Sequence, residues 1–223
     1  HVVHLELADE LHRICVENNI NYFIVAGTLL GAIRHEGFIP WDDDFDLGML
    51  RNDYEKFKEV LKKELHDDYY FMDMDNNEHY SLPFIKLMKK NTLIAEGNLP
   101  DNLENYGIFI DVFPFDSVPN NSLKKQYHKI TAEVYKKLLL AKNNYKINIS
   151  SSIKSVFYTV LKLISKLFSN NFLKNRLNYI SSKYNNEESE FLTNIGGAYG
   201  YSKETIQRSW TKSLKLYDFA GRK

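Results

Sequence analysis

The sequence is short of cysteine and proline, and its charges cancel. It has one cysteine and five prolines among 223 residues, with 29 basic residues balancing 29 acidic ones. A single cysteine, Cys15, excludes an intrachain disulfide and fits a reducing compartment, so we expect a cytoplasmic location. No uninterrupted apolar run approaches the ~18 residues of a membrane span, which argues against a transmembrane helix. The acidic side chains of the first ten residues do not fit a signal peptide.

The net charge of zero hides a strong division along the chain. Residues 1–119 contain 10 basic and 23 acidic side chains, whereas residues 120–183 contain 13 basic side chains and one acid, Glu133. We therefore predict an acidic core at 1–119 and a mainly helical, basic annex at 120–223 that packs on it and faces something anionic. Nucleic acid is not the expected partner, because aromatic residues alternate only sparsely with the lysines and the rest of the chain is acidic.

Four aspartates fall within five residues, at 42–44 and 46. Apolar residues precede and interrupt them, a pattern that favours a half-buried strand over a solvated turn. In a strand Asp42, Asp44 and Asp46 share one face. Carboxylates crowded on one face repel each other unless a cation keeps them ionised, and oxygen ligands at this spacing suit Mg²⁺ or Mn²⁺. A calcium loop of the EF-hand type does not fit, because its glycine and distant glutamate are missing.

A Gly-Thr pair, Gly27 and Thr28, follows the apolar run 22–26, which we predict to be a buried strand. A short helix is expected at 29–34. A helix that begins directly after a strand presents free backbone N–H groups and a positive dipole end, where a phosphate group can bind. The glycine-rich stretch 196–200 is a weaker candidate for the same role.

Two charged residues stand inside apolar runs that predict further strands, at 84–88 and 106–114. Lys86 requires an anionic partner there, unless it lies on an edge strand or extends its ammonium group to solvent. Asp111 requires a cation or strong donors, and we expect it to be a third ligand on a strand adjacent to Asp44 and Asp46. Asp116, just after this run, is expected to be a turn or capping residue.

Together these residues indicate phosphoryl-transfer chemistry. Two carboxylates can hold a pair of metal ions about 3.5–4 Å apart, which clamp the attacking and leaving oxygens at phosphorus. The third carboxylate completes the metal site or takes the proton of the attacking hydroxyl. Arg34 or Lys86 would offset charge in the transition state. A glycosidase also uses two carboxylates but has no need of a phosphate-binding turn.

The basic segment predicts amphipathic helices at 123–141 and 153–168. Two interpretations of the second helix remain open. It packs its apolar face on the core and leaves a solvated lysine face, or it lies on an anionic membrane surface.

The stretch G-T-L-L-G-A-I-R-H-E-G-F-I-P-W-D-D-D-F-D-L-G at 27–48 resembles the signature of LicD proteins, whose more distant relatives include fukutin and fukutin-related protein. The resemblance continues through 84–87 and 107–114. It implies an α+β fold, with a nucleotidyltransferase-like mixed sheet flanked by helices. It also implies transfer of phosphocholine from CDP-choline, or of a similar group from another CDP-alcohol, with release of CMP. The implied acceptor is a hydroxyl of a cell-surface glycan such as lipopolysaccharide or teichoic acid, or a lipid-linked precursor at the inner face of the membrane.

The resemblance also implies roles for individual residues. Gly27 and Thr28 would hold phosphates, Asp44, Asp46 and Asp111 would be the catalytic metal ligands, Asp42 would lie nearby, and Arg34 and Lys86 would face phosphate. Trp41 is either part of an aromatic site for the choline ammonium group or a core residue. Two alternatives stay open: a nucleotidyltransferase with an NTP donor, and a non-catalytic module that binds a cation or a CDP-alcohol.

Overall fold

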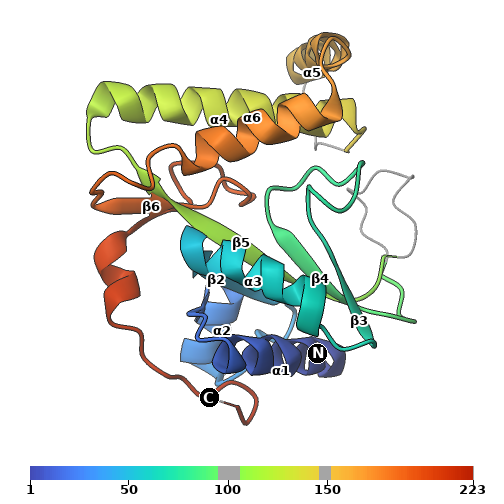
Figure 1. Cartoon of the computed structure of the whole chain (residues 1–223), viewed down its shortest axis with the longest axis vertical. Helices are drawn as coiled ribbons and strands as arrows, with labels where there is room; N and C mark the ends of the chain where they lie inside the picture. The colour runs from blue at the N-terminus through green and yellow to red at the C-terminus, as the bar shows by residue number, and fades with distance from the viewer. Residues whose placement is uncertain (95–105, 146–151, 223) are drawn as a thin grey trace.

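The computed structural model describes residues 1–94, 106–145 and 152–222, and it confirms an α+β fold built on one mixed sheet. Helices pack on both sides of this sheet (Figure 1). The first five strands are β1 (Phe23–Ile24), β2 (Asp46–Leu50), β3 (Tyr69–Met72), β4 (Ile85–Lys89) and β5 (Phe109–Val118). Their spatial order is β1-β2-β5-β4-β3, in which β2 and β5 run parallel and every other neighbouring pair is antiparallel.

The first helical layer is formed by α1 (Val2–Glu17), α2 (Ala26–His35) and α3 (Arg51–Glu64). Apolar side chains at helical spacing on α1, such as Leu7, Leu11 and Ile14, are fully buried against strands β2, β4 and β5. Phe57 of α3 joins the same core. Cys15 is buried here too. This layer packs against β2 and so positions Asp46, the first residue of that strand.

The second helical layer lies at the other end of the sheet, where α4 (Ser122–Lys142) and α6 (Asn170–Ser182) run side by side and α5 (Ser152–Ser165) is outermost (Figure 1). His128 of α4 links this helix to α6 and to the segment around Tyr201. Its ring nitrogens lie 2.7 Å from the Tyr201 hydroxyl and 2.9 Å from the Ile180 carbonyl oxygen. Burial lowers the pKa of His128, so the neutral imidazole is the form that packs here.

The annex also contributes strands that the sequence analysis did not predict. Strand β6 (Phe191–Thr193) pairs with the end of β5, β7 (Thr205–Gln207) pairs with β6, and a 3₁₀ helix, η1 (Arg208–Lys212), follows. Both strands are three residues long and lie among Asn, Ser and Gly residues, so neither produces a clear alternating pattern. Strands from both sides of residue 119 therefore pair within one sheet. The division into a core and an annex at that residue stays a prediction.

The helix at 152–165 packs one edge of its apolar face on the core, through Leu161, and leaves the rest of the described face exposed, so the choice between the two interpretations stays a prediction. Of its described side chains, Leu161 and Ser165 are buried, whereas Val156, Phe157 and Leu163 are more than half exposed. Among the residues described here, no helix is both long and apolar enough to cross a membrane.

Candidate active site

The aspartates do not form the strand face that their spacing suggests. Strand β2 begins only at Asp46, and Asp42, Asp43 and Asp44 lie in the turn before it. The Asp42 N–H donates to the Ile39 carbonyl oxygen at 2.9 Å and closes this turn. Aspartate has low strand propensity, and the apolar residues around the cluster imitate an alternating pattern without extending the strand.

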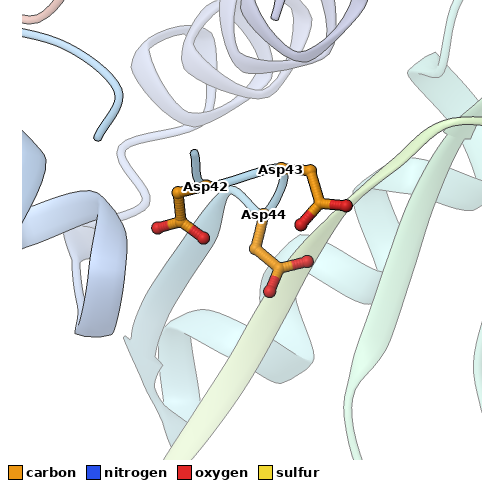
Figure 2. Close-up of side chains that lie close together, drawn as sticks. All are labelled: Asp42, Asp43 and Asp44. Carbon is orange, nitrogen blue, oxygen red and sulfur yellow. The ribbon is translucent and has the colours of Figure 1, made fainter. Parts of the chain in front are cut away.

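The turn nevertheless brings three carboxylates together. One oxygen each of Asp42, Asp43 and Asp44 lies within 4.8 Å of the others, and Figure 2 shows the three groups projecting from one bend of the chain. Within the described part of the chain, this is the group of acidic, histidine or cysteine side chains with the spacing of a metal site. Asp43, which the sequence analysis left out, belongs to it.

Asp46 lies beside Asp111 on the neighbouring parallel strand, in direct register. The predicted adjacency of these two strands is therefore confirmed, while the ligand role of Asp111 stays a prediction. The next strand, β4, places Lys86 opposite Asp111, with Nζ 2.9 and 3.1 Å from the two carboxylate oxygens. Lys86 is 2% exposed on an inner strand, and its Nζ lies 3.2 Å from the ring centroid of Phe109. It is thus a buried, paired lysine, and the edge-strand interpretation is wrong.

The site contains more negative charge than the protein compensates. Burial, together with repulsion from Asp111 and Asp44, raises the pKa of Asp46 to about 8. Burial and the neighbouring loop carboxylates also raise the pKa of Asp44, and Lys86 opposes both shifts. Among the described residues, no salt bridge joins Asp46 or the three loop aspartates to a basic side chain. Crowded oxygen donors that resist ionisation fit a bound divalent cation of the Mg²⁺ or Mn²⁺ class.

Helix α2 begins at Ala26, three residues earlier than predicted, so Gly27 and Thr28 belong to its first turn. Thr28 is buried, and its Oγ1 accepts a hydrogen bond from the Asp46 N–H at 2.8 Å. The Val25 N–H donates to the Asp46 carbonyl oxygen at 3.1 Å. These contacts tie the start of α2 to the first residue of β2, so Thr28 has a positioning role whether or not it also contacts phosphate.

Gly27 allows the Asp42 carboxylate to lie against the first turn of α2. A Cβ atom added at Gly27 would be 2.3 Å from Asp42 Oδ2. The first turn of a helix carries a partial positive charge, which favours an anion there. Ala26 has a φ of 49°, in the left-handed region, where a non-glycine residue is strained. The chain thus holds a strained backbone and an acidic side chain together at the expected phosphate-binding turn.

This geometry predicts different outcomes for two glycine substitutions in α2. Gly27→Ala displaces only the end of a side chain, so we expect a nearly unchanged melting temperature and weaker Mg²⁺ binding. Gly31→Ala places its Cβ 2.3 Å from the Gly37 carbonyl oxygen, a backbone atom, so we expect a lower melting temperature. Thermal unfolding with and without Mg²⁺ checks both. An unchanged Mg²⁺ response in Gly27→Ala would contradict the role given to Asp42.

The two remaining predicted binding residues, Trp41 and Arg34, lie at different distances from the aspartate turn. Trp41 is 83% exposed beside the aspartate turn, so the core interpretation is wrong and its ring faces solvent. Arg34 is exposed in the last turn of α2, about 10 Å along the helix axis from Gly27. A phosphate-facing role for Arg34 stays a prediction, with Lys86 in the more central position.

Asp116 is not a turn or capping residue. It is 1% exposed inside β5 and accepts from Arg51 Nε and Nη2 at 2.9 and 2.5 Å. Asn185 Nδ2 also donates to it, at 2.6 Å. These partners lie more than 60 residues away in sequence, so no local pattern indicated them.

The glycine-rich loop wraps the side-chain ammonium group of Lys136. Lys136 Nζ donates to the carbonyl oxygens of Ile195, Gly196 and Gly197 at 2.8, 3.2 and 2.9 Å. The N–H groups of both glycines donate to Asn194 Oδ1. Since these N–H groups are engaged, the loop does not fit the predicted phosphate site.

The C-terminal segment, which the sequence analysis did not place at the site, returns along the side of the molecule to α1 and supports the aspartate turn (Figure 1). Phe219 is buried, with its ring centroid 5.2 Å from that of Phe45, between Asp44 and Asp46. The Ala220 N–H donates to the Glu36 carbonyl oxygen at 2.7 Å, and Arg222 pairs with Asp9 at 2.6 Å.

Comparison with known proteins places this site in a family. The sequence model of the protein family described as LicD/FKTN/FKRP, nucleotidyltransferase domain, matches residues 19–148 of this chain. A protein of Haemophilus influenzae named lipopolysaccharide cholinephosphotransferase LicD is 29% identical over 234 aligned residues, covering 99% of this chain and 82% of that protein. Uncharacterized proteins of Rickettsia typhi and Rickettsia prowazekii are 46% and 45% identical over 56 residues, which is 25% of this chain. Since the family model covers more than half of the sequence, the chain belongs to the LicD/FKTN/FKRP nucleotidyltransferase-domain family.

Proposed function

We propose that this protein is a metal-dependent phosphotransferase that moves phosphocholine from CDP-choline to a hydroxyl group of a glycan. The observation that carries the proposal is the register of Asp46, Asp111 and Lys86 on three adjacent strands, directly beside the aspartate turn. The similarity to the Haemophilus cholinephosphotransferase over nearly the whole chain supports phosphocholine as the transferred group.

In this mechanism Asp44, Asp46 and Asp111 would hold the metal, and the carboxylates of Asp42 and Asp43, which lie close to that of Asp44, would add negative charge beside it. When bound, Mg²⁺ or Mn²⁺ supplies charge neutralisation at the phosphate oxygens. An acceptor hydroxyl oxygen forms a bond to the choline-side phosphorus as the bond from that phosphorus to the CMP oxygen breaks. One site carboxylate takes the hydroxyl proton. Lys86 pairs with the Asp111 carboxylate and fixes its orientation through the two hydrogen bonds.

Trp41 is the residue we propose for the choline end of the donor. Its exposed ring lies next to the first aspartate of the turn, and a quaternary ammonium group is attracted to the face of an indole. The acceptor we propose is a glycan, free or lipid-linked, at the inner face of a membrane.

A donor panel tests this proposal. We expect Mg²⁺-dependent thermal stabilisation by CDP-choline that exceeds stabilisation by CDP-ethanolamine, CDP-ribitol or CTP. Trp41→Ala should reduce the preference for CDP-choline over CDP-ethanolamine and leave CTP binding unchanged, because only the ammonium contact is removed. Equal stabilisation by all four compounds in the wild-type protein would contradict a choline-specific donor site.

Two other functions make distinguishable predictions. A nucleotidyltransferase with an NTP donor would release pyrophosphate from CTP. A binding module would be stabilised by CDP-choline and release no CMP with any glycan acceptor. The raised pKa of Asp46 favours an enzyme, because strongly shifted carboxylates concentrate at catalytic sites.

A further inference from the structure

The outermost helix carries an apolar stripe that the fold leaves uncovered. Six side chains on α5 and the turn after it are between 41 and 80% exposed: Val156, Phe157, Val160, Leu163, Ile164 and Leu167. Their spacing of three and four residues places them on one side of the helix. The helix is fastened to α4 by a different strip, which includes the buried Leu161 and Ser165. The exposed stripe is therefore not the side used for packing.

A second apolar stripe runs along α4. Four of its side chains, at the same helical spacing, are between 43 and 82% exposed: Leu123, Tyr127, Ile130 and Val134. The stripe continues through Leu138 and Ala141, which are buried near the end of α4 where α5 packs. Figure 1 shows α4, α5 and α6 as a layer at the end of the molecule farthest from α1. We call the two exposed stripes together the outer helical face.

Basic side chains surround this face. Lys162 and Lys166 are exposed on and just after α5. Lys183 Nζ lies 5.8 Å from the ring centroid of Tyr127, a member of the α4 stripe. The one acid of residues 120–183, Glu133, accepts a hydrogen bond from the Tyr201 N–H at 3.2 Å.

We infer that the outer helical face binds the surface of an anionic lipid bilayer. Apolar side chains at helical spacing can enter the boundary between headgroups and acyl chains, while lysine and arginine side chains contact lipid phosphates. Pairing with a second copy is disfavoured, because two faces from a segment with 13 basic side chains and one acid would repel each other. This surface function goes beyond the proposed reaction and does not depend on it.

Vesicle binding tests the inference. The wild-type chain should co-sediment with vesicles of phosphatidylcholine and phosphatidylglycerol and bind weakly to phosphatidylcholine alone. The double variant Phe157→Asp/Leu163→Asp should lower the partition coefficient about tenfold or more, because it removes two exposed apolar groups and adds negative charge. Both positions are exposed, so the folded structure and its melting temperature should be kept.

The matched control is Val2→Asp/Val16→Asp, which makes the same charge change at exposed apolar positions on α1. It should bind vesicles like the wild type, with at most a small loss from the added charge. Wild-type protein that stays in the supernatant with anionic vesicles would overturn the inference. So would equal losses in the two double variants, or a wild-type dimer in solution that only Phe157→Asp/Leu163→Asp dissociates.

Discussion

We expect Asp46→Asn to lower turnover by about a hundredfold or more and to leave the protein folded. Asp46 begins β2 beside Asp111, and its backbone N–H is held by Thr28, so an asparagine keeps the backbone contacts. The substitution removes one carboxylate from the proposed metal site and therefore part of the proposed charge stabilisation at phosphorus. Turnover is measured as CMP release from CDP-choline at saturating donor.

The same substitution should raise the melting temperature of chelator-treated protein. The pKa of Asp46 is raised to about 8, so folding disfavours its ionised form. A raised carboxyl pKa costs stability increasingly as the pH rises from about 4 to about 8, and the neutral amide avoids that cost. Asp67→Asn, at an exposed position outside the site, should change neither quantity. Wild-type turnover in Asp46→Asn would contradict its catalytic role.

Lys86→Met should lower the free energy of unfolding by about 3–5 kcal/mol, because it removes the buried ammonium group that pairs with the Asp111 carboxylate. Methionine fills a similar volume, so the loss comes mainly from the missing charge and its contact with the Phe109 ring. Urea denaturation measures the effect. Lys90→Met, at an exposed position four residues further along, is the control and should change stability little.

A double-mutant cycle separates this ion pair from general packing. In an Asp111→Asn background, Lys86→Met should cost clearly less than in the wild type, because no carboxylate is left uncompensated. The double variant should also be inactive, since it lacks both a proposed metal ligand and the Lys86 ammonium group. Equal costs of Lys86→Met in both backgrounds would mean that the ion pair does not hold the two strands.

Periodic signals predicted much of the scaffold. The apolar runs at 84–88 and 106–114 and the helical spacing at 123–141 indicated elements within a few residues of their observed bounds. The sequence also placed Asp111 on a strand beside Asp46, because a charge inside such an apolar run requires a partner. These predictions succeeded because the burial of one face of a helix or strand shows in the spacing of apolar residues along that element.

Other features depend on contacts that are distant in sequence. Alternating apolar residues suggested that the aspartate cluster is a strand, but the turn closed at Ile39 keeps Asp42 to Asp44 out of β2. The burial of Asp116 is explained by Arg51 and Asn185, which approach from other parts of the chain. The apolar pattern of α5 was identified correctly, yet no pattern can show that the surrounding fold leaves it uncovered.

The most direct test of the account is CMP release from CDP-choline with a glycan acceptor, measured with added Mg²⁺, with Mn²⁺, and after removal of divalent cations by EDTA. We predict release with either metal, loss with EDTA, and recovery when the metal is restored. Asp44→Asn and Asp46→Asn should stay inactive at every metal concentration. CMP release that persists in EDTA, or in both variants, would contradict a metal-dependent phosphotransferase centred on these aspartates.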